Sequence, residues 1–212
     1  MKRLHAIILT ALLATALAST RAEAQFVKFS LGLEAGGSGL LLLPTPESGL
    51  YISGGAQGGL ALDLHFGRFI GVSAAAHYAF HYYNFNIAGD YTASSMQHYI
   101  QVPVLLQLRT GKTVAIEAGI VQSILAASEY SEGVKGEDPT WSSNPDPGAA
   151  QYILSAAAGL KFYLGNTVYL TLRGTYGLSR AYNIYGYGAI PASAQLGIGF
   201  KLYNYRKSAF KL

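Results

Sequence analysis

Apolar and polar residues alternate along most of this chain, and the clearest case is the stretch 97–123. Every second residue over 100–108 is aliphatic, and 114–120 repeats the pattern with only small and aliphatic residues. A period of two is typical of a β-strand. The two runs are separated by a short connection around Gly111 and Lys112, so the sequence predicts a tight hairpin.

The second face of this hairpin carries small and polar residues with little charge. A soluble sheet buries its apolar face and covers the other with charge, whereas a transmembrane barrel turns its apolar face to lipid. The whole chain is only 12% charged, against about 25% in soluble domains. The pattern therefore favours a barrel. The residues of the second face include Tyr99, Gln101, Gln107, Arg109, Glu117 and Ser123.

The same alternation recurs in six further segments, which gives eight predicted strands. Three connections are about two residues long, at Gly67, at Gly111 and at Gly165, and the four between them are longer. Short periplasmic turns and long outer loops are typical of outer-membrane barrels, and an even number of strands closes the sheet. We therefore predict an all-β fold, an eight-stranded antiparallel up-and-down transmembrane β-barrel with both termini periplasmic. The predicted strands are about 26–35, 56–66, 70–83, 97–109, 114–123, 151–164, 168–177 and 193–203.

The four long connections are expected at 36–55, 84–96, 127–150 and 179–192. The third is acidic, and we interpret it as a solvated surface loop, with a partner or divalent-cation contact as the alternative. Tyrosines near the loop ends of the lipid-facing rows predict an interfacial aromatic girdle. The acidic residues are Glu129, Glu132, Glu137, Asp138 and Asp146, and the tyrosines are Tyr78, Tyr82, Tyr152 and Tyr176.

The first residues predict a cleavable signal peptide. Lys2 and Arg3 precede an apolar run over 6–18, and an A-x-A site ends at Ala24. We expect a signal peptide over 1–24, a barrel over 25–203 and a short basic periplasmic tail over 204–212. Part of the net charge of +4 lies in the leader, so the charge does not indicate nucleic-acid binding. The chain has no cysteine, which is compatible with a Gram-negative envelope.

The predicted lumen carries most of the chemistry. An eight-stranded barrel is just wide enough to be filled by its own side chains, and five inward cations face two inward acids. We expect a solvated salt-bridge network here, with a specific anion site as the alternative. The residues of this lumen charge cluster are Lys28, Asp63, Arg109, Glu117, Lys161, Arg173 and Lys201.

Catalysis and cofactors are not expected. His77 and His81 share one strand face and could bind a metal, but filling the lumen is the favoured interpretation. No serine and acid at recognisable spacing complete a hydrolytic triad. The last strand resembles the signal that barrel-insertion machinery recognises, which predicts that machinery as a partner. The residues of this signal are Gln195, Gly197, Phe200 and Leu202.

Residues 99–106, Tyr-Ile-Gln-Val-Pro-Val-Leu-Leu, resemble the Tyr-Leu-Glu-Ile-Pro-Leu motif of the PorT-like outer membrane β-barrel family, an OmpA/OmpX-type small barrel. With 117–119, 158–160 and 195–200 the resemblance covers nearly the whole mature chain. It departs at Gln101, where the family usually has an inward glutamate.

The resemblance implies a location among outer-membrane lipid in a Gram-negative bacterium. PorT itself belongs to a secretion system, so the resemblance implies a structural or accessory subunit of an envelope or secretion complex, or an autonomous surface barrel. A small-solute channel is the alternative from another class, and a soluble lipocalin-like carrier is the third.

Overall fold

The computed structural model describes residues 27–43, 52–67, 69–86, 91–134, 140–142, 146–184 and 187–206 of the 212-residue chain. The described residues form ten strands, eight long and two of three residues each. The strands are β1 (Val27–Leu43), β2 (Ile52–Phe66), β3 (Ile70–Asn86), β4 (Tyr91–Arg109), β5 (Val114–Val134), β6 (Thr140–Ser142), β7 (Tyr152–Leu164), β8 (Val168–Gly177), β9 (Tyr182–Ile184) and β10 (Tyr187–Arg206).

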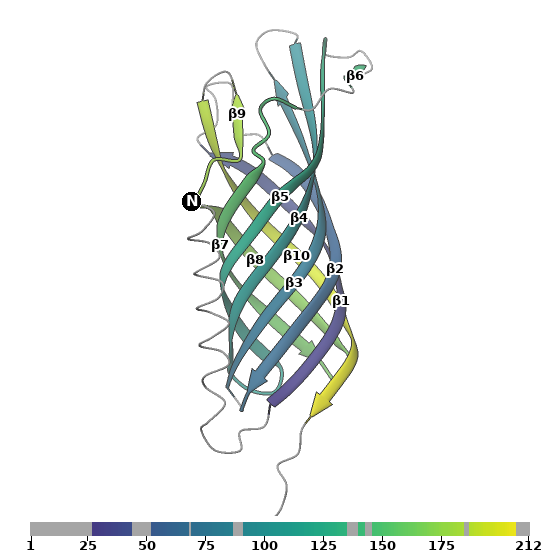
Figure 1. Ribbon diagram of the computed structural model, residues 1–212, viewed down its shortest axis with the longest axis vertical. Coiled ribbons are helices and arrows are strands. Elements are labelled where there is room, and N and C mark those ends of the chain that lie inside the picture. Colours follow the sequence, from purple (N-terminus) through teal and green to yellow (C-terminus); the bar gives the residue numbers. More distant parts are fainter. Residues whose placement is uncertain are drawn as a thin grey trace, which may run out of the picture.

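The eight long strands form a closed antiparallel barrel (Figure 1). Each long strand pairs with the next along the chain, and β1 pairs with β10 to close the ring. The short strands are additions at one end, where β6 pairs with β5 and β9 pairs with β10. The predicted eight-stranded up-and-down barrel is therefore confirmed. In the described residues there is no helix long and apolar enough to cross a membrane.

The three short turns lie at one end of the barrel, which we call the turn end. Gly67 and Gly165 have φ values of 70° and 85°, a conformation that glycine adopts without steric cost. The turns contain three or four residues, one or two more than expected, because Phe66 and Ile70, Arg109 and Val114, and Leu164 and Val168 bound the paired segments.

The strands extend much further toward the opposite end, the loop end, than the sequence predicted. β4 begins at Tyr91 and β5 ends at Val134, within stretches that we expected to be loops. At about 3.3 Å per residue, the 21 residues of β5 exceed the ~10 that a bilayer requires. Glycine-rich segments such as 36–39 remain in the sheet because their backbones still pair on both sides. The loop end therefore projects beyond the membrane, as β3, β4 and β5 on one side and β9 and β10 on the other (Figure 1).

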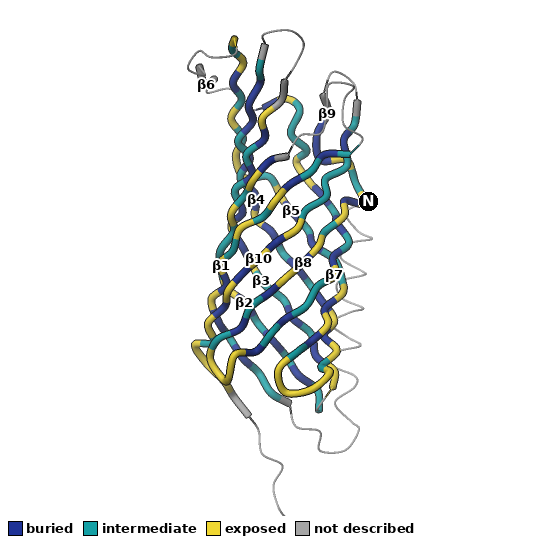
Figure 2. The backbone as a smooth tube through the Cα atoms, turned by 180° about the vertical axis from the view of Figure 1, so that it is seen from behind, coloured by how far each residue is buried: buried dark blue, intermediate teal, exposed yellow. Residues whose placement is uncertain are grey.

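The two faces of the wall differ as the alternation predicted. Exposed and buried positions alternate along the strands (Figure 2). Outward side chains such as Leu33 and Leu196 are 46% and 64% exposed, while inward Glu117 is 1% exposed. Three of the four predicted girdle tyrosines, Tyr78, Tyr152 and Tyr176, have exposed outward side chains, and Tyr82 is half-buried.

Some predictions lie outside the described residues. These are the signal peptide over 1–24, most of the basic tail, and two acids of the third loop, Glu137 and Asp138.

Candidate functional site

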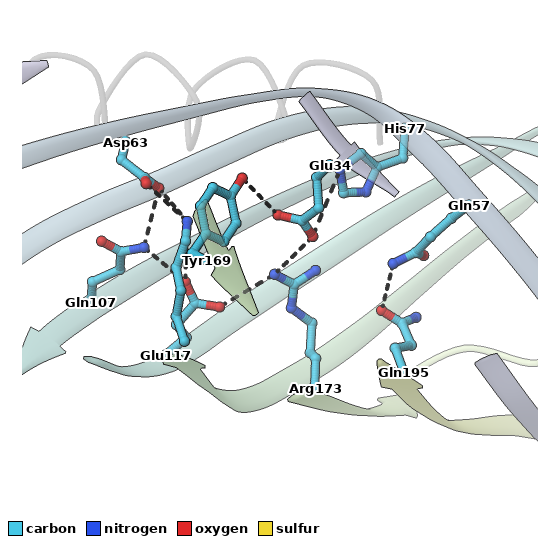
Figure 3. Close-up of polar contacts among 10 residues, drawn as sticks. Glu34, Gln57, Asp63, His77, Gln107, Glu117, Tyr169, Arg173 and Gln195 are labelled. Carbon is cyan, nitrogen blue, oxygen red and sulfur yellow. Dashed lines mark hydrogen bonds and ion pairs between the residues drawn. The ribbon is translucent and has the colours of Figure 1, made fainter. Parts of the chain in front are cut away.

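A buried ion-pair network crosses the middle of the lumen (Figure 3). The Lys161 ammonium donates to both carboxylate oxygens of Asp63, with N···O distances of 2.8 and 2.9 Å. In the ring of eight long strands, β7 and β2 are four places apart in either direction, so this ion pair spans the barrel. The Gln107 amide nitrogen lies between two acids and donates to Asp63 at 3.2 Å and to Glu117 at 2.7 Å.

Arg173 connects this centre to a third acid, Glu34. The Arg173 guanidinium lies 3.3 Å from a Glu117 oxygen and 3.8 Å from a Glu34 oxygen. Glu34 also accepts a hydrogen bond from Tyr169 at 3.2 Å, and His77 lies 4.0 Å from it. The cluster therefore holds three carboxylates and two permanent cations.

The expectation of two acids facing five cations was wrong. The first strand was predicted to end at residue 35, which would have put Glu34 near a loop. The strand continues to Leu43, so Glu34 lies deep in the barrel and is 4% exposed. The side chains of all the ion pairs are at most 5% exposed, so they pair directly and this part of the predicted cluster is not solvated as expected.

Glycines beside Glu34 leave room for its partners. In register around the wall, Glu34 lies opposite Gly59 on one side and Gly199 on the other. One strand further along the wall, Gly59 pairs with His77 and Gly199 pairs with Tyr169. A Cβ on Gly199 would lie 2.0 Å from Cζ of Tyr169, so the tyrosine ring occupies the space above this glycine. Two large side chains thus reach across neighbouring strands to one carboxylate.

Three of the predicted cations are not part of the ion-pair network. Lys28, Arg109 and Lys201 line a cavity at the turn end. The guanidinium of Arg109 and the ammonium of Lys201 each lie 4.3 Å from the centroid of the Tyr163 ring. The predicted cluster of seven residues is therefore divided into a buried network and a basic cavity.

A second buried cluster, which the sequence did not indicate, forms around Asp146 at the loop end. This carboxylate accepts hydrogen bonds from Ser95 and, at 2.8 Å, from Tyr182, and it caps the backbone N–H of Gly148 at 2.8 Å. It is 4% exposed. Burial, and next the Asp146 carboxylate, raise the pKa of the Tyr182 hydroxyl, which therefore stays a proton donor. Asp146 was expected in a solvated acidic loop, so that part of the interpretation was wrong.

Apolar side chains fill the lumen at the loop end. They belong to both short and long strands and form two buried clusters. The segment 146–151 is fixed beside them, since Leu125 donates to Gln151, Ala150 donates to Ala181, and Ala150 packs against the second cluster. The larger cluster contains Leu40, Leu42, Tyr83, Ala93, Tyr182 and Ala189.

His77 and His81 are both buried in the lumen, and they contact different neighbours. His77 lies against Glu34, while the His81 ring packs 5.3 Å from the Tyr99 ring, centroid to centroid. Among the described residues, no group of three or more metal-ligating side chains is present.

The four residues of the predicted insertion signal alternate across the last strand. Phe200 and Leu202 are exposed on the outer face, and Gln195 and Gly197 are buried inside. The Gln195 side chain accepts a hydrogen bond from Gln57 at 3.2 Å, which joins β10 to β2 across β1.

Comparison with known proteins identifies the family. The model of the outer membrane protein β-barrel domain matches residues 20–183, more than half of the chain. This chain belongs to that family. The family and the lipid-facing apolar wall place it in the outer membrane of a Gram-negative bacterium, among lipid. A search of curated proteins found no match.

This chain is similar to solved structures of small outer-membrane barrels. Neisserial surface protein A is 11% identical, with a TM-score of 0.53, and the match covers 82% of this chain and 99% of that one. The attachment invasion locus protein Ail of Yersinia pestis is 12% identical, with a TM-score of 0.42 and coverages of 84% and 99%. OprG from Pseudomonas aeruginosa is 13% identical, with a TM-score of 0.37 and coverages of 88% and 97%.

Proposed function

We propose that this outer membrane β-barrel domain protein is a non-enzymatic, non-conducting barrel that acts through its surfaces. One observation carries the proposal: the ion pair between Lys161 and Asp63 crosses the lumen, with Glu117, Arg173 and Glu34 bonded around it. A small-solute channel would need a continuous aqueous path, and eight-stranded barrels leave little room for one.

The filled loop end supports the same proposal. Tyr83 and Leu42 are 2% and 1% exposed there, and Tyr182 of the same cluster donates a hydrogen bond to Asp146. A solute entering from the loop end would have to displace both this cluster and the ion-pair network. Opening such a path would expose paired charges and apolar side chains together, which costs free energy on both counts.

The projecting strands are the surface that we expect to function. β4 and β5 stay paired as far as Tyr91 and Val134, and Glu129 and Glu132 are exposed on this extension. A paired ribbon presents side chains in fixed positions, which suits recognition of another envelope component. The PorT-like resemblance supports an accessory subunit of an envelope or secretion complex, with an autonomous surface barrel as the other form of this proposal.

The route to the membrane is part of the proposal. We infer that residues 1–24 are removed as a signal peptide, that barrel-insertion machinery recognises Gln195, Gly197, Phe200 and Leu202, and that both termini and the turn end face the periplasm. The paired positions of Lys28 and Arg206 at the turn end support a common side for the chain ends.

The decisive experiment is conductance in planar lipid bilayers. The purified protein should give no stable conductance steps, while a 16-stranded porin reconstituted in parallel should give them. Stable steps from the wild-type protein would overturn the proposal in favour of a small-solute channel.

A mild-detergent pull-down from the native outer membrane then separates the two forms of the proposal. A stoichiometric partner that is lost when Glu129 and Glu132 are changed to glutamine would establish an accessory subunit bound at the loop end. A barrel that is recovered alone would establish the autonomous form. Absence from the outer-membrane fraction would contradict both.

A further inference from the structure

A basic cavity opens at the turn end, on the far side of the ion-pair network from the filled loop end. Its volume is about 1080 Å³. Residues of β1, β2, β4 and β10 form its wall, and the three turns form its rim. Its polar and charged lining includes Lys28, His65, Arg109, Lys112 and Lys201.

The charge of this cavity has one sign. Four of its lining residues are lysine or arginine, and none of the described lining residues is aspartate or glutamate. Asp63, an acid of the adjoining network, is already paired, because both of its carboxylate oxygens accept hydrogen bonds from the Lys161 ammonium. In the described part of the chain, no carboxylate lies within the 4.0 Å ion-pair distance of Arg109 or Lys201. A concave wall of like charge concentrates the positive potential inside it.

Two of the lining cations, Arg109 and Lys201, which we call the floor of the cavity, are held in place by a buried tyrosine. The Tyr163 ring, 3% exposed, lies 4.3 Å from both the Arg109 guanidinium and the Lys201 ammonium. A cation over an aromatic ring is positioned but keeps its full charge. The Arg109 Nε atom is also buried without a hydrogen-bond partner in the described structure. The floor thus holds two ordered cations, one of which has a buried N–H without a partner.

From this geometry we infer that the turn-end cavity binds an anion that carries a phosphate group. Guanidinium groups bind phosphate oxygens through paired hydrogen bonds, and ammonium groups add compact charge. The volume is that of a small-molecule site and exceeds the needs of a single inorganic ion, so the phosphate is attached to a larger group or to a second phosphate. The same chemistry is available from a free phosphate compound and from the head group of an anionic lipid at the membrane rim.

Glycine amides provide a local measurement of binding. Gly67, Gly111 and Gly165 line the cavity, whereas Gly133 and Gly148 lie at the loop end. The full protein, labelled with ¹⁵N-glycine and held in an uncharged detergent without phosphate buffer, is titrated with inorganic pyrophosphate. A second titration uses short-chain phosphatidylglycerol, with short-chain phosphatidylcholine as the uncharged lipid control.

Matched variants test which cations are responsible. Arg109→Gln and Lys201→Gln each remove one positive charge from the floor. Arg180→Gln removes the same charge from an exposed position at the loop end and controls for the net charge of the molecule. Unchanged spectra for Gly119 and Gly159, in the wall of the lumen, confirm that each variant is folded.

We expect a saturable shift of the three cavity glycines with pyrophosphate, phosphatidylglycerol or both, and none at Gly133 or Gly148. Each floor variant should weaken binding by about tenfold or more, and Arg180→Gln should bind like the wild type. A response to phosphatidylglycerol alone identifies a lipid head group as the ligand, and a response to pyrophosphate alone identifies a free phosphate compound. Absence of binding to both probes, or equal weakening by Arg180→Gln, would overturn the inference.

Discussion

Replacing Lys161 with methionine tests whether the centre of the lumen is held by a buried ion pair. The substitution keeps an unbranched apolar side chain and removes the ammonium group. Asp63 then keeps a neutral partner, the Gln107 amide at 3.2 Å, but loses its only cation within 4.0 Å among the described residues. Glu117 still has Arg173 at 3.3 Å, so the damage is concentrated at Asp63.

The magnitude follows from the burial of both partners. The side chains of Lys161 and Asp63 are 1% and 4% exposed. Removing one partner of such a pair leaves an uncompensated buried charge and costs about 3–5 kcal/mol of unfolding free energy. Replacing both partners with apolar residues removes that charge, so the double variant Lys161→Met with Asp63→Leu should lie within about 2 kcal/mol of the wild type.

The assay is equilibrium urea unfolding of the barrel in lipid vesicles. The control is Lys112→Met, which removes an exposed lysine in a turn and should change stability by no more than about 0.5 kcal/mol. If Lys161→Met costs less than about 1 kcal/mol, or if the double variant is as unstable as the single one, the pair is hydrated and the reasoning fails.

Two further substitutions test other parts of the barrel. Gly199→Ala would place a Cβ 2.0 Å from the Tyr169 ring and should cost about 1–3 kcal/mol in the same unfolding assay. Gly39→Ala, with no atom within 4 Å, should be neutral, and equal costs at the two sites would contradict the packing argument. Tyr182→Phe removes a donor from buried Asp146 at a cost of about 1–3 kcal/mol. It should therefore hasten proteolysis at 146–151 while the transmembrane strands stay protected, and an unchanged cleavage rate would show that this contact does not hold the segment.

For nearly every strand, the sequence predicted which side chains face lipid and which face the lumen, because the lipid side requires apolar side chains and the lumen accepts polar ones. Leu106 and Gln107, for example, are neighbours in sequence but are 50% and 0% exposed. The positions of the turns, though not their lengths, could also be predicted, and Gly67 and Gly165 adopt positive φ there. Both signals are local, and a period of two fixes the side of the wall for each residue.

The contacts of the site could not be predicted because they depend on how the strands are staggered. Lys161 and Asp63 are 98 residues apart in sequence and meet across the lumen, which no local pattern encodes. Glu34 was missed as a network member because its strand continues through glycines that give no alternation. Asp146 was misplaced because its loop folds inward, and composition alone made that loop look like a solvated surface.

The glycine row beside Glu34 has a consequence for how the barrel assembles. The strands β1 and β10 come from opposite ends of the chain, so their pairing, the seam of the barrel, has the greatest sequence separation. Its formation carries the largest loss of chain entropy, and no local contacts assist it. Two hydrogen bonds each step across one strand of this seam, from Tyr169 to Glu34 over β10 and from Gln57 to Gln195 over β1. A slip of this seam by two residues would place Glu34 opposite Gly197 or Lys201 and move it away from the Tyr169 hydroxyl, which stays in register with Gly199. The two hydrogen bonds therefore form only when the barrel closes in the native register, and they stabilise that register over its neighbours.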